Sequence, residues 1–392
     1  MSVFLRVITL NCWALPQPWP IGSKYRKYRI EKLVEALQNA DYDVISLQEL
    51  WSEKDYLFIC NSLQGNYPYA HYFHSGFTGS GVCVISKHPI VSTLMHRYSL
   101  NGFAHHVHRG DWFGGKVVGL VLLEVGDFHV SFYTTHLHAE YNRANDLYLP
   151  HRLSQAFELS QFVKHTEALS DCTILTGDFN IEPEDLGYRL ITNNAHLNDS
   201  WPDRPSCNAD GCTGMTDERP DNCFTHKSAL EECPEGKRLD YIMYKPGKAK
   251  IRLLECENRL GKIPDSKIDY SDHLGVYSMF EISEESTPKT SEKPGLDLGI
   301  LNESIKIVGE GEMRALWDRR LFLAACVILL ALIISTFAIE VHFSYFTVFA
   351  TIARFFLTLL FGFSIWYGLI GLTMELKALK AAKLSMQQLL ND

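Results

Sequence analysis

Two polar side chains in this sequence stand where short apolar runs end, at positions typical of strand ends. Asn11 follows the run at 3–10, and Glu49 closes the run at 43–49. Open α/β sheets bind their ligands beyond the ends of their strands. A carboxylate held there suits a hard cation such as Mg²⁺, which takes oxygen ligands and usually only one or two protein carboxylates. Because a lone glutamate at a strand end is more often simply solvated, Glu49 is only a candidate metal ligand.

A histidine pair and a GDxN segment follow two further apolar runs. TTHLHAEY places His136 and His138 on one face at the end of an alternating strand, where a pair of this kind is more often structural than catalytic. In ILTGDFNIEPED, the small size of Gly177 lets Asp178 and Asn180 turn toward a common ligand. The aspartate offers a base or a water-orienting acceptor, and the asparagine offers an uncharged donor for a phosphoryl oxygen.

Two aspartates and a histidine complete the set. RLDYI puts Asp240 in another strand, and SDHLG sets Asp272 beside His273 before the last strand. Each fragment alone arises readily by chance. A carboxylate, a histidine, GDxN, an aspartate and an Asp-His pair, each placed after or within a strand and in this order, form a specific signal.

The segment RGDWFGGKVVG has glycines and a lysine that would suit a phosphate-binding loop. It lacks the GxxxxGK[ST] spacing and leads into a strand, so Lys116 is either an auxiliary phosphate contact or a solvated lysine. Asp111 and Trp112 are candidate lid residues. The nearby histidine triplet is interpreted as a solvated loop rather than a metal site: His105, His106 and His108.

The elements that must position these residues can be read from periodicity. Apolar residues recur at helical spacing within 24–40, and two more helices are expected at 151–167 and 184–193. Strands in runs with a few helices predict two packed sheets with helices outside, an α/β or α+β layered body. Beyond the two runs above, strands are expected at 82–86, 117–124, 128–135, 172–177, 239–244 and 275–282.

Composition excludes some classes of protein. The chain has 392 residues, with 37 basic against 46 acidic residues and a net charge of −9, which disfavours a general nucleic-acid binder.

The cysteines and the N-terminus bear on the compartment. The ten cysteines are scattered, as expected of reduced thiols in a cytosolic body, and the N-terminus lacks the features of a secretory signal. Four of the cysteines invite a zinc interpretation, but no CxxC pair occurs and unpaired loop thiols are favoured: Cys207, Cys212, Cys223 and Cys233.

The C-terminal part contains two uncharged apolar stretches, 321–339 and 355–374, each close to the ~20 residues that an α-helix needs to cross a bilayer. They predict a transmembrane hairpin within 314–374, with 341–353 as an interfacial or lumenal turn. Two buried core helices are the alternative interpretation. A flexible linker is expected at 284–313, since 283–295 is rich in Ser, Glu, Lys and Pro, and an amphipathic tail at 375–392.

Charges flanking the hairpin predict its orientation. By the positive-inside rule both ends face the cytosol, and so does the body at 1–283. The basic residues that flank the two stretches are Arg314, Arg319, Arg320, Lys377, Lys380 and Lys383.

In their order, these motifs resemble those of the DNase I-like metal-dependent phosphodiesterase superfamily and, within it, most of all the membrane-anchored neutral sphingomyelinases. The resemblance covers nearly the whole chain and is weakest at 198–236. It implies a DNase I-like four-layer α/β sandwich followed by a two-helix membrane hairpin. The segments that carry it are LNCW (10–13), QELWSE (48–53), SGVCVISKHPI (80–90), HRGDWFGGKVVGL (108–120), THLHAEYNR (135–143), GDFNIEPEDLG (177–187), RLDYIMY (238–244) and SDH (271–273).

The resemblance also implies a role for each residue. Glu49 is the Mg²⁺ ligand, Asn11 completes its environment, and Asp272 supports the metal or the phosphate. His273 is the general base that activates water, and Asp240 holds its imidazole in the useful tautomer.

The remaining roles concern the substrate. His136 donates to phosphoryl oxygens or to the leaving alkoxide, and Lys116 is an auxiliary phosphate contact. Asp178 and Asn180 position water and phosphate, and Asn180 also influences substrate choice. Elsewhere in the superfamily the aspartate of GDxN is argued to take the water proton, so Asp178 and His273 compete as the base.

The expected activity is phospholipase C-type hydrolysis of sphingomyelin to ceramide and phosphocholine, at a cytosolic face of the endoplasmic reticulum, the Golgi or the nuclear envelope. Lyso-phosphocholine lipids are alternative substrates. Phosphoinositides are disfavoured because TGDFNIE and DYSDHLG lack that class's Trp, Arg and PAWCDR-like segment. A nuclease does not explain the hairpin or the acidic balance, and a catalytically dead scaffold would lack one of the site residues, whereas all are present.

Overall fold

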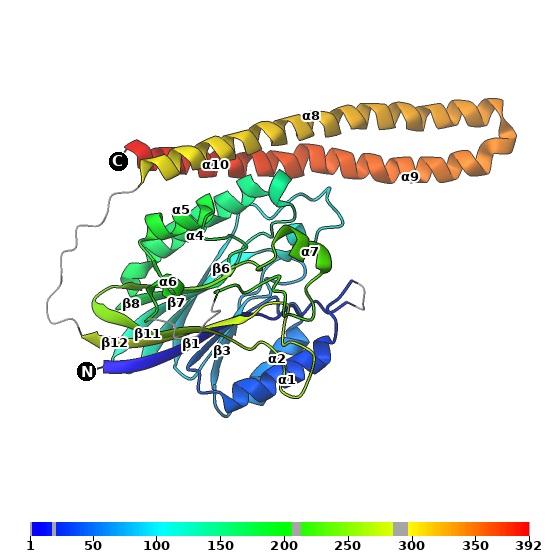
Figure 1. Cartoon of the computed structure of the whole chain (residues 1–392). Helices are drawn as coiled ribbons and strands as arrows, with labels where there is room; N and C mark the ends of the chain where they lie inside the picture. The colour runs from blue at the N-terminus through cyan, green and yellow to red at the C-terminus, as the bar shows by residue number, and fades with distance from the viewer. Residues whose placement is uncertain (1, 18–20, 206–212, 285–296, 392) are drawn as a thin grey trace.

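The computed structural model describes residues 2–17, 21–205, 213–284 and 297–391. Two six-stranded mixed sheets pack face to face, which confirms the predicted two-sheet body (Figure 1). The first sheet has the order β11-β12-β1-β2-β4-β3 and the second β5-β6-β7-β8-β10-β9. The strands are β1 (Ser2–Asn11), β2 (Val44–Gln48), β3 (Tyr69–Tyr72), β4 (Cys83–Ser86), β5 (Ile90–Arg97), β6 (Val117–Val125), β7 (Phe128–His136), β8 (Cys172–Asp178), β9 (Asn198–Asp199), β10 (Asp240–Pro246), β11 (Ala249–Arg259) and β12 (Gly275–Glu284).

Strand alternation explains why both faces of the central strands are apolar. In β1, Leu5 and Val7 enter the core between the two sheets, whereas Ile8 and Leu10 enter the core on the outer side. Neighbouring side chains of a strand point to opposite faces, so a strand that is covered on both sides needs both sets apolar. The result is a four-layer sandwich of helices, sheet, sheet and helices.

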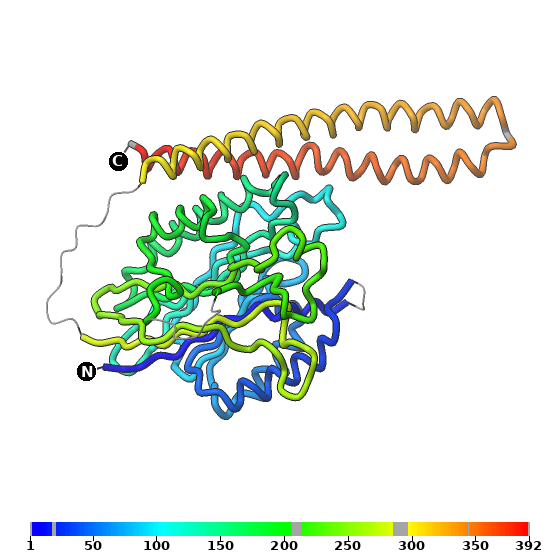
Figure 2. The backbone as a smooth tube through the Cα atoms, viewed as in Figure 1, coloured from blue at the N-terminus to red at the C-terminus, as the bar shows by residue number. Residues whose placement is uncertain are grey.

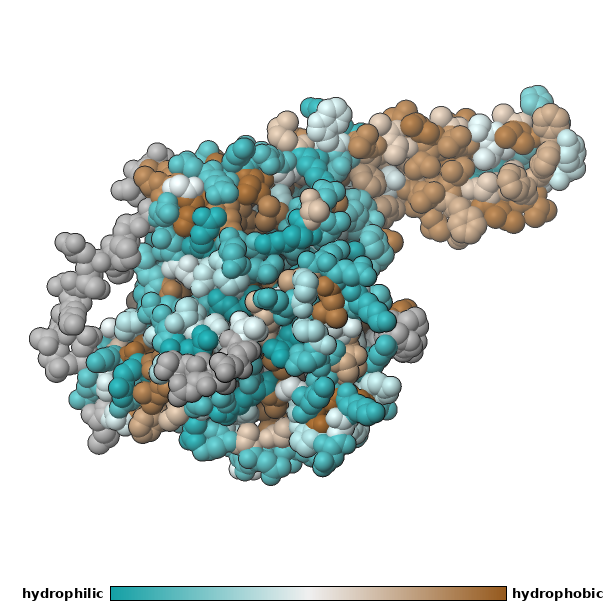
Figure 3. Space-filling model, viewed as in Figure 1, coloured by the Kyte–Doolittle hydropathy of each residue, from teal (hydrophilic) through white to brown (hydrophobic). Residues whose placement is uncertain are grey.

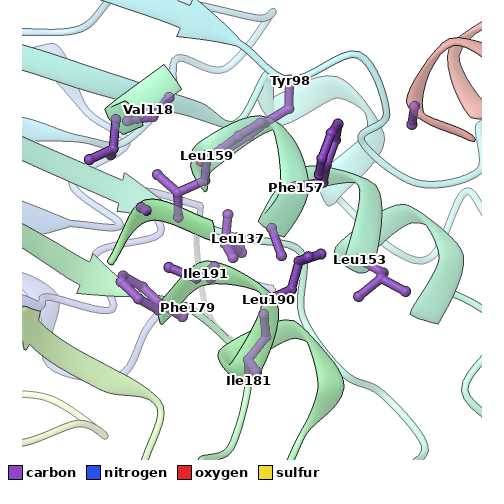
Figure 4. Packing of buried hydrophobic residues seen from close by; sticks show 14 of the residues in the cluster. Tyr98, Val118, Leu137, Leu153, Phe157, Leu159, Phe179, Ile181, Leu190 and Ile191 are labelled. Carbon is purple, nitrogen blue, oxygen red and sulfur yellow. The ribbon is translucent and has the colours of Figure 1, made fainter. Parts of the chain in front are cut away.

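Helices close the two outer faces. α1 (Arg26–Asn39) and α2 (Glu53–Leu63) cover the first sheet, and α4 (Leu149–Thr166) and α5 (Leu186–Ala195) cover the second. Figure 4 shows side chains such as Leu153 and Phe157 of α4 and Leu190 of α5 packed together against the sheet. Full burial of one such side chain stabilises the fold by about 1.5–3 kcal/mol. Three short helices lie in loops: α3 (Asp111–Gly114), α6 (Ser200–Asp203) and α7 (Lys227–Glu232).

The C-terminal part is a helical hairpin that projects beyond the body (Figures 1 and 2). Its helices are α8 (Leu298–His342), α9 (Thr347–Trp366) and α10 (Leu372–Asn391), with a π-helical turn at Tyr367–Gly371 between the last two. Two continuous helical segments of the hairpin, Leu298–His342 and Thr347–Leu390, are long and apolar enough to cross a membrane. Only 11% of the most apolar window of each segment is buried. The alternative of two buried core helices is therefore wrong, and the projecting part is apolar on its surface (Figure 3).

Three predicted boundaries of this region are wrong. The linker predicted at 284–313 is helical from Leu298 onward, because the first turns of α8 pack on α4 and α5; residues 285–296 lie outside the described part. The turn predicted at 341–353 is confined to 343–346, and α9 already starts at Thr347. The tail predicted at 375–392 is not separate, because α10 continues the hairpin back along α8.

The hairpin is docked on the body through an apolar contact. Leu301 and Val308 of α8 and Leu379 and Met386 of α10 are fully buried in the same core cluster as α4 and α5. Polar contacts accompany them: His151 Nε2 of α4 lies 3.3 Å from Glu375 Oε1 of α10. The base of the hairpin is thus a further layer on the outside of α4.

Candidate active site

Strand register brings the predicted residues to one end of the two sheets. In the parallel pair β7 and β8, His136 lies opposite Asp178, and in the antiparallel pair β10 and β8, Asp240 lies opposite the same Asp178. In the first sheet, Asn11 pairs with Gln48, the residue before Glu49. Side chains that are far apart in sequence therefore meet where these strands end.

Backbone conformation at these ends is unusual. Gly177 has a φ of 138°, and a Cβ built there would lie 2.0 Å from the carbonyl oxygen of Thr135, so a side chain is excluded. Glu49 and Asn180 have φ values of 54° and 50°, in the left-handed region that non-glycine residues rarely adopt. Such conformations cluster at functional sites, where the surrounding structure fixes them.

Glu49, His136 and Asp178 form the first of two groups able to hold a cation. One ligand atom from each lies within 4.8 Å of the others. The amide Nδ2 of Asn11 joins the carboxylates, donating to Glu49 Oε1 at 3.1 Å and to Asp178 Oδ2 at 2.9 Å. Burial, and then the carboxylate of Asp240, raise the pKa of Asp178 to about 7. A divalent cation would favour the ionised form, and the oxygen donors suit Mg²⁺, so the residues fit this metal.

His273 belongs to the second group, with Asp178 and Asp240. Its Nδ1 lies 2.8 Å from Asp240 Oδ2, and its Nε2 lies 3.7 Å from Asp217 Oδ1. Burial by itself lowers the pKa of His273, but the carboxylates of Asp217 and Asp240 outweigh it and the pKa lies well above its ordinary value. The predicted pairing of Asp240 with the imidazole is thus present in the geometry.

Asp217 is a site residue that the sequence analysis did not find. It lies in the stretch 198–236, follows no strand and belongs to no motif. An isolated bridge to Lys237 carries it to the site, where burial raises its pKa. The pattern of a polar residue after an apolar run cannot mark a residue placed by a loop.

Asp272 lies beside these groups, outside the two cation-binding sets found among the described residues. Its Oδ1 accepts a hydrogen bond from Ser271 Oγ at 3.1 Å. Burial raises its pKa to about 7 against the opposing pull of His273, with Asp217 and Glu49 adding to the rise. Its role in supporting the metal or the phosphate stays a prediction.

Lys116 is buried, 1% exposed, so the interpretation as a solvated lysine is wrong. Its Nζ lies 3.0 Å from His136 Nε2 and 3.0 Å from Asp111 Oδ1, and it donates to the Leu137 carbonyl at 2.8 Å. Burial, and then the Lys116 charge, lower the pKa of His136 well below its ordinary value, so its ring is neutral. Direct contact of Lys116 or His136 with phosphate stays a prediction.

One of the lid candidates, Trp112, and one of the neighbouring histidines, His105, contact the hairpin. Trp112 packs on the cluster of Ala104, Tyr367 and Leu372, and His105 Nδ1 lies 2.9 Å from the Tyr367 hydroxyl. The triplet is therefore not a fully solvated loop. His105 and His106 are half-buried, whereas His108 is exposed; none of the three belongs to a cation-binding group among the described residues.

His138 and Asn180 both lie near this end of the sheets. His138 is buried, its Nδ1 donates to the Ala139 carbonyl at 2.9 Å, and its ring stacks on Tyr148, as befits a structural histidine. Asn180 donates from Nδ2 to the Leu137 carbonyl at 3.1 Å. It also lines a small cavity of about 50 Å³ whose walls are almost entirely polar: Glu140, Arg143, Asn180, Glu182, Asp185, Asp217, Glu218, Lys237 and Leu239.

The cysteines do not form a metal site in the described part of the chain. Cys223 accepts a hydrogen bond from the Asp269 amide and Cys233 donates to the Gly236 carbonyl, while Cys207 and Cys212 lie outside the described residues. Every cysteine that the structure describes is a free thiol, and neither cation-binding group contains one.

Comparison with known proteins gives matches over most of the chain. Residues 8–273 match the Endonuclease/Exonuclease/phosphatase family. A Caenorhabditis elegans protein, provisionally named a neutral sphingomyelinase, is 51% identical and covers 99% of this chain and 91% of its own length. Sphingomyelin phosphodiesterase 2 of Homo sapiens is 37% identical over 81% of this chain and 75% of its own. An inositol phosphosphingolipids phospholipase C of Schizosaccharomyces pombe is 32% identical over 96% and 94%.

Solved structures of low sequence identity share the fold. The sphingomyelinase C of Streptomyces griseocarneus has a TM-score of 0.53 at 19% identity, covering 71% of this chain and 99% of that chain. A Staphylococcus aureus β toxin variant with bound magnesium ions has a TM-score of 0.51 at 18% identity, covering 72% and 100%. The body therefore has the DNase I-like architecture that its sequence predicts. The chain belongs to the endonuclease/exonuclease/phosphatase family and, within it, to the neutral sphingomyelinases, hydrolases of the phosphodiesterase class.

Proposed function

We propose that this protein hydrolyses sphingomyelin to ceramide and phosphocholine in a Mg²⁺-dependent reaction, at the cytosolic face of the membrane that holds its hairpin. One observation carries the proposal: Asp178 belongs both to the cation-binding group and to the group that contains the His273–Asp240 pair. A phosphodiester bound between the two would have charge-neutralising groups on one side and a proton acceptor on the other. Phosphoryl transfer needs this positioning more than it needs covalent chemistry.

The carboxylates of Glu49 and Asp178, with Asn11 between them, would hold Mg²⁺ at this point. The bound ion would neutralise the negative charge of the phosphate and of the transition state. Asp272 would support the ion or the phosphate from the neighbouring loop. His136, neutral and held against Lys116, would contact the phosphoryl oxygens or the leaving alkoxide together with Asn180.

His273 would accept the proton of the attacking water. The water oxygen forms a bond to phosphorus as the bond from phosphorus to the ceramide oxygen breaks. The ceramide oxygen takes a proton from solvent to become the ceramide hydroxyl, and the proton held by His273 returns to solvent. The 2.8 Å contact between His273 Nδ1 and Asp240 supports this assignment, because it orients Nε2 toward the water and stabilises the imidazolium. Asp178 is the competing base, and its role there depends on whether the cation lowers its pKa.

The hairpin would anchor the catalytic body to the membrane that contains the substrate. Arginines precede the first apolar stretch and lysines follow the second, which supports a cytosolic position for both ends. The endoplasmic reticulum is the membrane that the family resemblance favours, with the Golgi and the nuclear envelope as alternatives.

A hydroxyl-rich headgroup such as inositol is the second candidate substrate. The cavity beside Asn180 has a wall of carboxylates with an arginine and a lysine and no aromatic ring, whereas quaternary ammonium groups are often bound by aromatic rings. The Schizosaccharomyces pombe relative is named for phospholipids with this headgroup. Sphingomyelin remains the first candidate because relatives of higher identity are named for it.

The test is headgroup release from mixed micelles by the purified full chain, with and without Mg²⁺. The assay compares four lipids at equal concentration: sphingomyelin, lysophosphatidylcholine, phosphatidylcholine and an inositol phosphosphingolipid. Cleavage of single-stranded DNA is measured separately in solution. Fastest release of phosphocholine from sphingomyelin, abolished by a chelator and restored by Mg²⁺, is the expected result. Faster turnover of the inositol lipid, of a lysolipid or of DNA would contradict sphingomyelin as the substrate. Turnover that continues in the presence of the chelator would contradict the proposed dependence on Mg²⁺.

A further inference from the structure

Two loops of the catalytic body carry strongly exposed apolar side chains. Phe77 is 89% exposed, the highest value among the large apolar residues that the structure describes, and Val107 is 74% exposed. An isolated exposed apolar residue is ordinary in a soluble protein. The position of these two, relative to the hairpin and to the active site, is what distinguishes them.

The loop with Val107 leaves the body at the point where the hairpin becomes apolar. Within this loop, Ala104 and Trp112 pack against Tyr367 and Phe322, and His105 also contacts the Tyr367 hydroxyl. Beyond this contact the surface of α8 is apolar, and Leu321 and Val327 are 61% and 70% exposed. In Figure 1 the loop lies between the sheets and the hairpin, at the level where the hairpin leaves the body, and Figure 3 shows the apolar surface continuing from there.

The loop with Phe77 is fixed to the same segment. The Phe77 amide donates to the Phe113 carbonyl at 2.9 Å. Gly76 and Gly115 cross so closely that a Cβ on Gly115 would lie 2.5 Å from the Gly76 Cα, and both have positive φ values of 63° and 67°. Phe77 is therefore held by α3, and the two loops form one rim.

Trp51 connects this rim to the active site. It lies two residues after Glu49, and its ring centroid is 6.3 Å from that of His136. On its other side, a Cβ built on Gly114 of α3 would lie 3.4 Å from the Trp51 ring. The rim with Phe77 and Val107 thus borders the site through one aromatic side chain.

We propose that Phe77 and Val107 are a bilayer-contact surface, which inserts into the lipid headgroup region beside the active site while the hairpin crosses the same bilayer. The inference rests on the membrane anchoring proposed above. Its occupant is the lipid surface itself, because the rim is continuous with the apolar part of the hairpin at the Trp112–Tyr367 contact. Exposed aromatic and aliphatic side chains at a membrane interface bind by burying apolar area in the boundary between headgroups and acyl chains.

The first test uses the full chain reconstituted in phosphatidylcholine vesicles. The Phe77→Ser/Val107→Ser double variant is compared with wild type on long-chain sphingomyelin in the vesicle, and on a short-chain sphingomyelin below its critical micelle concentration. Loss of two inserted apolar side chains should lower vesicle activity about tenfold and leave activity on the dissolved lipid within about twofold. The matched control is Leu169→Ser, which removes a 61% exposed leucine from the short 3₁₀ turn after α4 and should change neither activity. Equal losses on both substrates, or no loss on vesicles, would overturn the proposal.

The second test does not depend on activity, so it separates this proposal from the proposed function. Phe77→Trp and, as the control, Leu169→Trp are reconstituted in vesicles containing brominated phosphatidylcholine. The absolute loss of tryptophan fluorescence per mole of protein, relative to vesicles without bromine, is compared with that of wild type. This loss should be larger than that of wild type for Phe77→Trp and equal to it for Leu169→Trp. An equal result for both would show that the rim does not reach the bilayer, which leaves it as a surface for another partner or for water.

Discussion

The Nδ2 amide of Asn11 donates a hydrogen bond to Asp178 Oδ2 at 2.9 Å, and this contact joins the two sheets of the body at the active site. Asn11 ends β1 in the first sheet and Asp178 ends β8 in the second. The same amide also bonds to Glu49, so a single side chain fixes the distance between two carboxylates that would otherwise repel each other.

Asn11→Asp should raise the Mg²⁺ concentration required for half-maximal activity by about tenfold or more. The variant keeps the size of the side chain but replaces a bridging donor with another carboxylate, so the two ligands are no longer held together. The measurement is initial rate against Mg²⁺ concentration. An unchanged requirement for Mg²⁺ would show that Asn11 does not organise the metal site.

Glu49→Gln should lower Mg²⁺-dependent turnover by about a thousandfold while the fold is kept, because the amide retains the shape and loses the charge that binds a hard cation. A metal that binds only the folded protein raises its melting temperature, so Mg²⁺ should stabilise wild type and not the variant. Glu53→Gln, at the exposed start of α2, is the matched control. Full activity of Glu49→Gln at ordinary Mg²⁺ would exclude Glu49 as a ligand.

His273→Ala should lose several orders of magnitude in kcat/KM, and the acid limb of the pH profile should disappear from the remaining activity. A general base must be deprotonated before it acts, so the rate rises with pH through its pKa. Asp178→Asn is the decisive comparison. If the limb persists in His273→Ala and disappears in Asp178→Asn, Asp178 is the base and His273 only orients the phosphate.

Asp217→Asn should move the acid limb of kcat/KM to lower pH. In wild type the Asp217 and Asp240 carboxylates raise the pKa of His273 above the ~6.5 of an ordinary imidazole. The acid limb of wild type should therefore lie at a pH above ~6.5. Without Asp217 the imidazolium is less stabilised, and more of the base is free at acid pH. Activity relative to its own maximum should therefore rise at pH 6. Glu218→Gln, whose carboxylate pairs with Lys237, should leave the limb in place.

Much of the fold and most of the site were predictable, because the residues concerned stand at the ends of strongly apolar strands. The Ile30, Leu33, Val34 and Leu37 face of α1 is buried as its spacing predicts. The strands β3, β5, β9 and β11 were not predicted, and all four are terminal strands of their sheets; much of β5 is exposed. A strand with only one partner needs no continuous apolar run, so its sequence carries a weaker signal.

The sequence could not predict the tertiary contacts of Lys116, of Asp217 or of the base of the hairpin. Glycines around Lys116 indicate a loop, but only the fold shows that the loop turns inward and buries the charge against Asp111. The first turns of α8 follow a polar segment and contain several charges, so their burial depends on α4 lying opposite. Sequence patterns report an element's own periodicity and not the surface that it meets.

Removing residues 298–392 should destabilise the body, because it uncovers the α4 and α5 surface that Leu301, Val308 and Leu379 bury. Each buried side chain of this kind contributes about 1.5–3 kcal/mol, so aggregation or a clearly lower melting temperature is expected. Replacing only 325–363 with a short Gly-Ser linker keeps both docked ends and should give a folded protein that is active on dissolved short-chain lipid. If the complete deletion melts like the shortened hairpin, the docking contact adds nothing to stability.

With the hairpin in a membrane, as proposed, the docking of α8 and α10 on α4 would also determine which molecules the active site can meet. A body tethered by a slack chain could swing and sample neighbouring membranes, whereas a body fixed to its own anchor keeps one height and one tilt. Encounter with the proposed lipid substrate would then be a lateral search within one leaflet. The rate of hydrolysis should then depend on the mole fraction of substrate lipid in the membrane that holds the enzyme, and not on the total lipid concentration of the sample. Vesicles that lack the enzyme should keep their substrate when they are mixed with vesicles that contain it.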